Sequence, residues 1–511
     1  MGYLLGIDAG TTAMKVALYG EDGALRASSV QEYQVETPAE GRVEIEAEEY
    51  WRACVAGVRE VLGMSRVPPD EIKGLAITSQ GETFVPVDSS GRPLRPAIVW
   101  LDNRAIKESE DIARNFGASR VFKVTGQPEV VPTWTACKVL WLKRHEPETF
   151  HKAHKILMVE DYLIHRLTGL YATDCSVVSS TIYLDINRGD WWDEMLDFIG
   201  ISREKLPALT FSGRAIGTLR KEAAAKTGLS AETLVAGGAM DQVAGAISAG
   251  NIAPGRATET TGTALALTVT LERPICDERY KIPCHYHAWE GGYMLMAWAE
   301  SAGLALRWFR DVFGTQEKLV AESAELDAYD LLAASAEKIP PGCEGLLALP
   351  HLTGAACPEF DPHARGVFFG VSLKHSRGHF VRAIMEAVAF MLRRNLDLVE
   401  DMGIEVKEVT SLGGAAKSAL WNQIKADVLE RPILALSSEM GAAAGAAMLA
   451  GIASGSFKNL SQAYERFASP ARRFTPDPAH FPIYRHQYKM YKSLYEKTRD
   501  LFPFLTQKEE K

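Results

Sequence analysis

A short stretch near the start of the chain combines a glycine with two hydroxyl residues, a pattern that suits phosphate binding. Residues 6–15 read Gly-Ile-Asp-Ala-Gly-Thr-Thr-Ala-Met-Lys, and apolar residues flank them. Gly10 would let the backbone come close to a ligand, while Thr11 and Thr12 can donate hydroxyl hydrogen bonds to phosphate oxygens. An ordinary glycine-containing hairpin is the alternative, because this pattern alone does not distinguish the two.

Two charged side chains in the same stretch are spaced for phosphoryl transfer. Asp8 stands at the end of an apolar run, where a carboxylate can hold a hydrated Mg²⁺. Lys15 follows the turn and can reach back toward a phosphoryl group. Together with the alternation of apolar residues after the turn, they predict a strand, a tight turn and a second strand around a phosphate site.

The second half of the chain repeats this order. Residues 256–259 predict a strand, the sequence Thr-Thr-Gly-Thr at 260–263 predicts a turn, and residues 264–269 predict the next strand. Two similar halves would place two phosphate loops on opposite sides of one cleft.

A linker signal, Asn-Ile-Ala-Pro-Gly at 251–255, separates the two halves. Length supports the division, because 511 residues exceed what one hydrophobic core usually holds. We therefore predict an N-terminal domain over 1–250, a C-terminal domain over 256–455 and a helical extension over 456–511.

Two predicted strands end in polar clusters, which is how an α/β sheet presents a binding edge. A strand at 72–78 runs into Ser-Gln-Gly-Glu-Thr, and a strand at 97–100 runs into Leu-Asp-Asn-Arg. Helices are predicted over 44–62, 243–249, 297–313, 379–402, 418–429 and 441–453. The last of these consists largely of Ala and Gly and should pack closely against another element.

Composition limits the classes of partner. A net charge of -9 without a basic cluster argues against nucleic acid. The seven cysteines lack paired spacing, as expected of free thiols in a reducing cytosol. The predicted hairpin starts at the N-terminus, and no segment is long and apolar enough to span a bilayer. A cytoplasmic protein without a membrane partner is therefore expected.

Three segments along the chain carry a family resemblance. They are Ala-Ile-Val-Trp-Leu-Asp-Asn-Arg at 97–104, Gly-Ala-Met-Asp-Gln at 238–242 and Pro-Glu-Phe-Asp-Pro-His-Ala-Arg-Gly-Val-Phe-Phe-Gly at 358–370. With the first hairpin, they resemble the FGGY carbohydrate kinases, the group of glycerol kinase, xylulokinase, ribulokinase and gluconate kinase. Actin and Hsp70 have a similar hairpin but lack the three segments. The resemblance implies an α/β fold of two actin-like ATPase domains, ribonuclease H-like, with a cleft between them and with ATP and Mg²⁺ as cofactors.

The resemblance gives Asp241 the central role in catalysis. The aspartate at this position of the family is the general base, which accepts the proton of the hydroxyl being phosphorylated. It would also share the metal with Asp8. The alternative is a helix N-cap, since Asp241 stands at a predicted strand-to-helix turn.

An acceptor pocket is implied in the same way, formed by Gln80, Gly81, Glu82, Trp100, Asp102, Thr133 and Gln242. Glu82 and Gln242 match glycerol kinases. Gly81 and Thr133 stand where those enzymes carry Arg and Tyr, so a wider pocket and a longer acceptor are expected.

Trp100 would pack its ring against the carbon chain of a polyol, with Asp102 as a nearby hydroxyl acceptor. Plain core packing is the alternative for Trp100, because aromatic residues at strand ends usually fill space.

The nucleotide would lie between turns of both halves, on Gly10, Thr11, Thr12, Lys15, Gly262, Thr263, Gly303, Gly413, Gly414, Ala415 and Ser418. Some of these glycines would also serve as plain turn residues. Cys276, Cys284, His285 and His287 have the residue types of a metal site, but a Cys-x-x-Cys spacing is absent and xylulokinases have a similar Cys-His pair without a structural metal.

The sequence narrows the substrate to a small sugar or polyol. A pentulose kinase of the xylulokinase type is the leading hypothesis, because residues 140–148 also resemble xylulokinases. Glycerol kinase, or another kinase of short polyols or ketoses, is the alternative. A nucleotide-dependent sugar sensor on the same fold is the non-enzymatic alternative. We also consider a homodimer.

Overall fold

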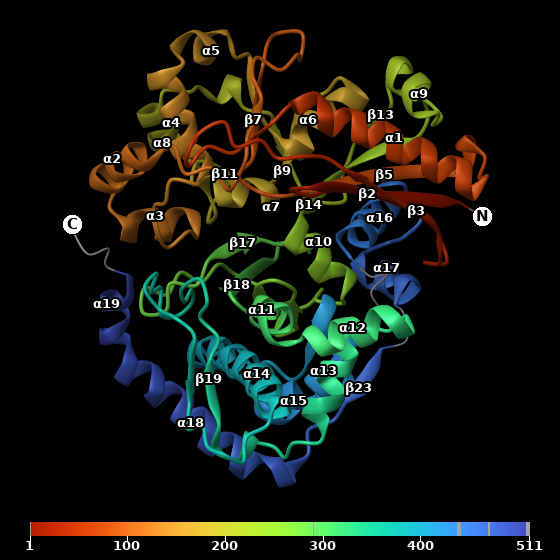
Figure 1. Cartoon of the computed structure of the whole chain (residues 1–511). Helices are drawn as coiled ribbons and strands as arrows, with labels where there is room; N and C mark the ends of the chain where they lie inside the picture. Colours follow the sequence, from red (N-terminus) through yellow and green to blue (C-terminus); the bar gives the residue numbers. More distant parts are fainter. Residues whose placement is uncertain (1, 290, 437–440, 469–470, 507–511) are drawn as a thin grey trace.

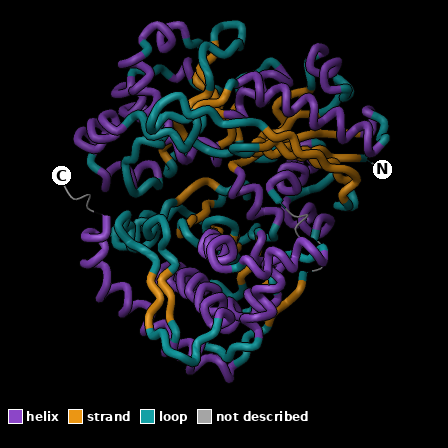
Figure 2. Tube along the Cα trace, in the orientation of Figure 1, coloured by secondary structure: helices purple, strands orange, loops and turns teal. Residues whose placement is uncertain are grey.

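The computed structural model describes residues 2–289, 291–436, 441–468 and 471–506. Two halves lie one above the other in Figure 1, the N-terminal half in red to yellow and most of the C-terminal half in green to blue. In both halves strands lie inside a layer of helices and loops (Figure 2). Residues 507–511 of the predicted extension lie outside the described part of the chain.

The N-terminal half is organised around a six-stranded sheet. Its strand order is β13 (Ala215–Thr218), β14 (Leu234–Met240), β5 (Ile72–Ser79), β1 (Tyr3–Ala9), β2 (Ala13–Gly20) and β3 (Leu25–Glu32). The strands β1, β2 and β3 are antiparallel neighbours, whereas β5 and β14 run parallel to β1. All residues of β1 after Tyr3 are buried, which explains a continuous apolar run in place of alternation.

A seven-stranded sheet in the C-terminal half repeats this topology. Its order is β17 (Cys284–Tyr286), β18 (Tyr293–Ala299), β16 (Leu265–Leu271), β15 (Ala257–Thr261), β21 (Val409–Leu412), β22 (Ile433–Ala435) and β23 (Arg472–Phe474). The strands β15, β16 and β18 are antiparallel neighbours, and β21 and β22 run parallel to β15. The predicted internal repeat is confirmed, and each Gly-Thr turn joins two antiparallel strands at the centre of its sheet.

Helices cover both faces of the N-terminal sheet, and one of them comes from late in the chain. The helix α1 (Ala47–Ser65) packs on β2 and β3, while α16 (Ala442–Ala453) packs on the opposite face (Figure 1). A Cβ atom on Gly6 would lie 1.8 Å from the carbonyl oxygen of Ala443, so this glycine is required for the fit. The expected close packing of α16 is confirmed. The sequence-based division assigned α16 to the C-terminal domain, but its contacts tie it to the first sheet.

The remaining helices surround the two sheets. In the N-terminal half these are α2 (Ile106–Phe116), α3 (Ala118–Thr125), α4 (Thr135–His145), α5 (Pro147–Lys152), α6 (Val159–Thr168), α7 (Cys175–Val178), α8 (Asp193–Ile199), α9 (Lys221–Thr227) and α10 (Asp241–Ser248). In the C-terminal half they are α11 (Gly303–Phe313), α12 (Thr315–Ala324), α13 (Ala328–Glu337), α14 (Arg377–Asp401), α15 (Ala419–Leu429), α17 (Leu460–Phe467), α18 (Phe481–Thr498) and α19 (Phe502–Thr506).

Smaller sheets complete the fold. A four-stranded sheet has the order β4 (Glu44–Ile45), β7 (Ala97–Ile98), β6 (Phe84–Val87) and β8 (Lys155–Met158). Two-stranded pairs join β9 (Ala172–Asp174) to β12 (Ala208–Thr210), β10 (Leu184–Asp185) to β11 (Asp190–Trp191), and β19 (Leu347–Leu349) to β20 (Val367–Phe369).

Two segments predicted as helical contain strands. The helix predicted over 297–313 begins only at Gly303, because the preceding residues form β18 and pair with β16 and β17. The segment 456–511 is not wholly helical, since β23 adds an edge strand to the second sheet. Both errors have one cause: pairing with a distant strand outweighs local helix preference.

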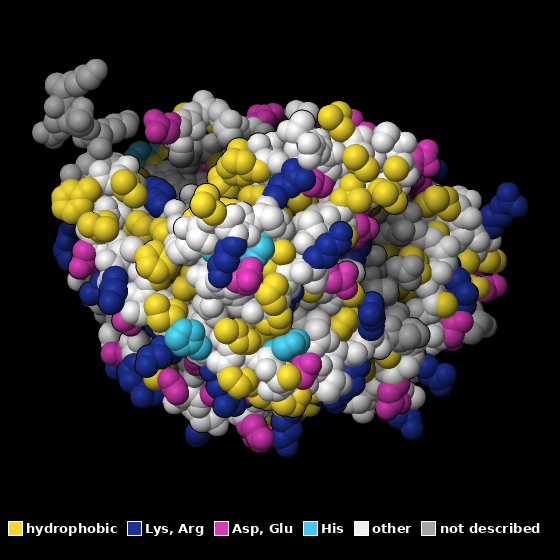
Figure 3. Space-filling model, turned by 60° about the horizontal axis from the view of Figure 1, so that its bottom comes forward, with side chains coloured by type: hydrophobic (Ala, Val, Ile, Leu, Met, Phe, Trp, Pro, Cys, Tyr) yellow, Lys and Arg dark blue, Asp and Glu magenta, His cyan; other side chains and the backbone are white. Residues whose placement is uncertain are grey.

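The surface and the helices give two further facts. On the face shown in Figure 3, lysine and arginine side chains are interspersed with aspartate and glutamate, so neither sign of charge dominates it. Among the described helices none has the length and apolar character needed to cross a bilayer.

Candidate active site

The first phosphate turn, at the end of β1, keeps its polar groups accessible. The N–H of Gly10 donates to the carbonyl oxygen of Ala13 at 3.1 Å and closes the turn. Thr12 and Lys15 are exposed. Lys15 pairs with Asp8 across the two strands, and its Nζ lies 4.0 Å from Asp8 Oδ2. The exposed ammonium group of Lys15 therefore lies near the turn, where it can reach a ligand.

Three acids lie close enough beyond this turn to influence one another. Burial raises the pKa of Asp8 to about 6, and the charge of Lys15 opposes this shift. Burial also raises the pKa of Asp241 to about 7; the charges of Asp8 and Glu82 add to it, and a hydrogen bond from the N–H of Gln242 at 2.6 Å opposes it. The mutual repulsion of these groups marks a place prepared for a cation or a proton.

Asp8 and Asp241 fit a hydrated Mg²⁺ ion. This ion commonly binds one or two protein carboxylates and takes its other ligands from water and substrate phosphates. Across the described ranges no group of three or more His, Cys, Asp or Glu side chains forms a metal-binding cluster, and this includes the region of Cys284 and His285. Asp8 and Asp241 are the two carboxylates that would hold such an ion.

The N-cap alternative for Asp241 is wrong. Asp241 is the first residue inside α10, and Met240 occupies the cap position. The Asp241 carboxylate accepts a hydrogen bond from the N–H of its neighbour, Gln242, through Oδ1. The residue is half-buried directly after β14, and its role as the general base stays a prediction.

A chain of hydrogen bonds joins the acceptor residues to the phosphate turn. Trp100 Nε1 donates to Thr11 Oγ1 at 2.9 Å, Thr11 Oγ1 donates to Gln80 Oε1 at 2.6 Å, and Gln80 Nε2 donates to Tyr50 Oη at 3.0 Å. Gln80 is buried with both polar ends bonded, so it supports the turn from behind. Trp100 is 38% exposed, which contradicts plain core packing and leaves its ring available to a ligand.

Glu82 is held in an unusual conformation directly after β5. Its φ of 56° is left-handed, which is uncommon for a residue with a side chain. Burial raises the pKa of Glu82, and a hydrogen bond from Ser180 and the charge of Lys138 oppose the rise. Lys138, on α4, is fully buried; burial lowers its pKa to about 8, and its Nζ donates to the carbonyl oxygen of Val99 at 3.0 Å. Sequence reasoning missed Lys138 because a single lysine in an apolar helix gives no motif.

Two acceptor residues have other surroundings than expected. Asp102 is fully buried, and its carboxylate accepts hydrogen bonds from the N–H of Val43 at 2.5 Å and from the Arg104 guanidinium at 2.8 Å. This arrangement fixes the loop after β7 and does not present the carboxylate to a ligand. A Cβ atom on Gly81 would lie 2.8 Å from Ser180 Oγ, so Ser180 lies against the loop at this glycine. Thr133 is half-buried in the turn before α4.

A cavity of about 460 Å³ in the C-terminal half collects most of the predicted nucleotide residues. Its lining includes Gly262, Thr263, Gly303, Gly414, Ala415 and Ser418. Gly413 stands beside it at a φ of 81°, where a Cβ would lie 2.7 Å from the carbonyl oxygen of Thr261. Residues that the sequence did not reveal also line this cavity: Arg307, Asp327, Tyr329, Asp330, Met385 and Trp421. They come from α11, α14, α15 and the start of α13, which only the tertiary fold brings together.

A buried ion pair anchors the second Gly-Thr turn. Lys425 Nζ, on α15, lies 2.5 Å from Glu259 Oε1, and both side chains are completely buried. Glu259 also accepts hydrogen bonds from Thr261, at 2.6 Å, and from Ser411. Removing one member would leave an uncompensated buried charge, so this network fixes the turn against β21 and α15.

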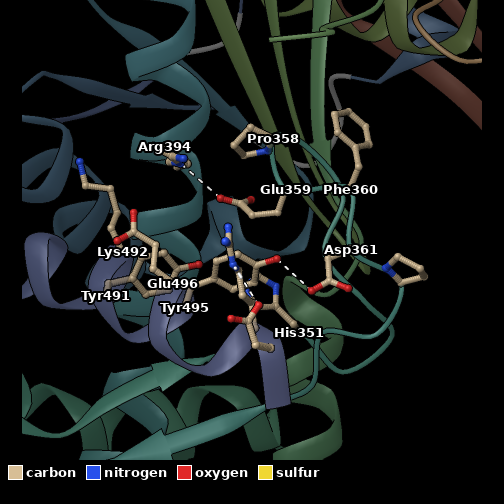
Figure 4. Close-up of a pocket in the computed structure, with 13 residues that line it drawn as sticks. His351, Pro358, Glu359, Phe360, Asp361, Arg394, Tyr491, Lys492, Tyr495 and Glu496 are labelled. Atoms are coloured by element: carbon tan, nitrogen blue, oxygen red, sulfur yellow. Dashed lines mark hydrogen bonds and ion pairs between the residues drawn. The ribbon is translucent and has the colours of Figure 1, made fainter. Parts of the chain in front are cut away.

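The family-like segment 358–370 lines a different cavity, of about 560 Å³, against α18. In Figure 4 the side chain of Arg394 points toward Glu359, and that of Tyr495 points toward Asp361. The two pairs are 3.3 Å and 3.0 Å apart. The predicted site residues do not line this cavity, and Arg394 and Asp361 are already bound by Glu359 and Tyr495. This segment therefore ties its loop to α14 and α18.

Comparison with known proteins agrees with the site. Residues 3–248 match the N-terminal domain of the FGGY family of carbohydrate kinases, and residues 258–454 match its C-terminal domain. The xylulose kinase of Bacillus subtilis is 33% identical over 98% of both chains, and the gluconokinase of the same organism is 29% identical over 92% of this chain and 91% of its own. The crystal structure of xylulose kinase from Rhodospirillum rubrum has a TM-score of 0.88 and 29% identity, covering 98% of this chain and 99% of that chain.

The chain belongs to the FGGY family of carbohydrate kinases. It is a phosphotransferase that uses ATP and has an alcohol group as its acceptor. The predicted fold class, two actin-like ATPase domains, is confirmed. The alternative of a non-enzymatic sensor is accordingly set aside.

Proposed function

We propose that this kinase phosphorylates a pentulose of the xylulose type, with Asp241 as the general base. The observation that carries the proposal is the position of Asp241: it lies near Asp8 and Glu82 at the end of a buried strand, with a pKa raised to about 7. A base with a pKa near the working pH accepts the proton of an attacking hydroxyl efficiently. Similarity to the Bacillus subtilis xylulose kinase over 98% of both chains supports the choice of substrate.

The residues divide between the phosphoryl donor and the acceptor. Asp8 and Asp241 would hold a Mg²⁺ ion, which supplies positive charge to the oxygens of the transferring phosphate. Lys15 extends from the first turn toward the same group and adds a second positive charge. The cavity between α11, α13 and α15 would hold the nucleoside, with Gly262 and Thr263 at its phosphate end.

On the acceptor side, Glu82 and Gln242 would bind neighbouring hydroxyls of the sugar. The half-exposed ring of Trp100 offers an apolar face to its carbon chain. Gln80, Gly81, Thr133 and Asp102 would then act indirectly, by shaping and holding the loops that carry Glu82 and Trp100. The positive charge of Lys138 would compensate the negative charge of Glu82.

Specificity constants for a panel of acceptors test this proposal. ADP release would be coupled to NADH oxidation with xylulose, ribulose, xylitol, arabitol, gluconate and glycerol as acceptors. We expect kcat/KM for xylulose to exceed that for glycerol by at least about tenfold, or roughly 1.4 kcal/mol. Gluconate is the second candidate, because a gluconokinase is among the similar proteins. A preference for gluconate or glycerol over every pentulose would overturn the proposal.

A further inference from the structure

The strand that carries Asp241 into the site is irregular just before that residue. The strand β14 pairs with β5 up to Ala236 and resumes only at Ala239, so Gly237 and Gly238 form a bulge. A Cβ atom on Gly238 would lie 1.5 Å from the carbonyl oxygen of Ile77, so the strands are too close for any side chain there. A bulge redirects the residues that follow it. The orientation of the Asp241 side chain therefore depends on the contacts that hold these two glycines in place.

Two buried acids hold the bulge from the neighbouring elements α6 and β9. Glu160 Oε1 accepts a hydrogen bond from the N–H of Gly238 at 2.9 Å. The N–H of Met240 donates to Ser176 Oγ at 2.9 Å, and Ser176 Oγ donates to Asp174 Oδ1 at 2.6 Å. Glu160 thus holds the bulge directly, while Asp174 holds the residue next to Asp241 through one serine.

Each of the two acids also leaves one oxygen without a partner. Both are fully buried, and Glu160 Oε2 and Asp174 Oδ2 find no N–H or O–H donor in the part of the chain described. Burial raises the pKa of Glu160 well above its ordinary range, and the charges of Asp174 and Asp161 add to this rise.

We propose that Glu160 and Asp174 together position Asp241 for catalysis. They are positioning residues, since they reach Asp241 through Gly238 and through Ser176 and Met240. The inference rests on the proposed role of Asp241 as the general base. Two negative charges in this buried site would repel each other and loosen the bulge, so we expect Glu160 to keep its proton.

Replacing Glu160 separates positioning from general stability. Glu160→Gln keeps an oxygen for the N–H of Gly238 and carries no charge, so it imitates the protonated acid. Glu160→Ala removes the bond to Gly238. We expect kcat of the alanine variant to fall at least about tenfold, with KM for ATP unchanged, and kcat of the glutamine variant to stay within about threefold of wild type. Equal kcat values for the alanine variant and the wild type, or equal losses in both variants, would overturn the proposal.

Ser176→Ala provides a second test if the alanine variant at 160 does not fold. It cuts the link between Asp174 and Met240 and should also lower kcat about tenfold without changing KM for ATP. Ser212→Ala is the matched control, because Ser212 Oγ donates to the same Asp174 oxygen at 3.4 Å but, among the described residues, makes no side-chain hydrogen bond to β14. Loss of kcat in both serine variants, or in neither, would contradict the proposal.

A double variant separates failure of this inference from failure of the proposed function. If the pair acts through Asp241, Ser176→Ala should reduce the residual rate of Asp241→Asn by less than about twofold, since the group it positions is already gone. A further tenfold loss would show that the pair acts elsewhere, while full activity of Asp241→Asn alone would instead overturn the role of Asp241.

Discussion

Trp100 and Thr11, which lie 89 residues apart in the chain, share a hydrogen bond of 2.9 Å from the indole Nε1 to the threonine Oγ1. Trp100 belongs to the proposed acceptor side of the site and Thr11 to the proposed phosphate turn. Thr11 Oγ1 in turn donates a hydrogen bond to Gln80 Oε1 at 2.6 Å, so the residue that follows β5 belongs to the same network. The acceptor loop and the phosphate turn are therefore one unit, and a change on one side should be felt on the other.

Trp100→Phe tests this unit. The variant keeps an aromatic face but loses the N–H that binds Thr11, a bond worth about 1 kcal/mol. We expect kcat/KM for ATP to fall roughly three- to tenfold although Trp100 belongs to the acceptor side. Steady-state kinetics with each substrate varied would measure it. An effect on the acceptor KM alone would mean that the contact does not couple the two sides.

Asp241→Asn should fold and bind ATP but lose phosphoryl transfer. Asparagine keeps the shape of the side chain but cannot accept the proton, and loss of a general base costs about a hundredfold or more in kcat. Single-turnover assays measure the transfer step, and fluorescence titration with a nucleotide analogue checks binding. A turnover within tenfold of wild type would refute the assignment.

Local pattern was sufficient where a motif carries its own geometry. The Gly-Thr turns, the strands at 72–78 and 264–269 and the small-residue helix at 441–453 were all predictable, because turn residues and apolar periodicity encode them. The strand β18 and the edge strand β23 were missed, since distant partners form them. The position of α16 on the opposite half was equally invisible, as no local signal states which sheet a helix will cover.

The same distinction, between local pattern and tertiary contacts, applies to the residues of the site. Asp8 was predicted from its place after an apolar run, whereas Asp241 and most glycines of the nucleotide cavity came from the family resemblance, and their roles stay predictions. The sequence did not reveal Lys138 or Tyr329, because their surroundings arise from burial and from helices brought together by folding. The wider acceptor pocket argued from Gly81 and Thr133 also stays a prediction.

Gly445→Ala and Gly245→Ala form a matched pair on the facing helices α16 and α10. A Cβ on Gly445 would lie 2.1 Å from the carbonyl oxygen of Ala244, whereas a Cβ on Gly245 would meet nothing within 4 Å. We expect Gly445→Ala to destabilise the protein by about 1–3 kcal/mol and Gly245→Ala to be neutral or stabilising by up to about 1 kcal/mol. Thermal and urea unfolding followed by circular dichroism would show it. Similar shifts in both variants would contradict the packing argument.

Gly303→Ala should weaken ATP binding selectively. A Cβ there would lie 2.2 Å from the carbonyl oxygen of Gly262, so the second phosphate turn and the start of α11 would have to separate. We expect KM for ATP to rise about tenfold or more while KM for the acceptor changes little. Gly63→Ala in α1, where a Cβ meets nothing within 4 Å, is the control. If both KM values rise together, the turn does not act on the nucleotide alone.

Because Glu160, which accepts a hydrogen bond from β14, is buried and protonated, we expect the stability of the protein to depend on pH. Burial raises the pKa of Glu160 above its ordinary value, so the folded protein keeps a proton that the unfolded chain loses above pH of about 4.3. Stability is then full below that pH and falls as pH rises through the folded pKa, by up to about 1.4 kcal/mol per pH unit. Glu160→Gln removes this proton from the balance, so the wild type should lose more stability than the variant between pH 5.5 and pH 8.5.

Asp161 and Asp174 are present in both the wild type and Glu160→Gln. Their contributions to the pH dependence of stability therefore cancel when the two proteins are compared. Burial raises the pKa of Asp161 to about 7 and also raises that of Asp174, so both proteins keep some pH dependence of their own. The difference between the two urea-unfolding curves at each pH isolates Glu160, provided that Asp174 keeps its charge beside the glutamine amide. Equal losses of stability in the two proteins would mean that Glu160 carries no extra proton in the folded state, because a group ionised in both states cannot make folding depend on pH.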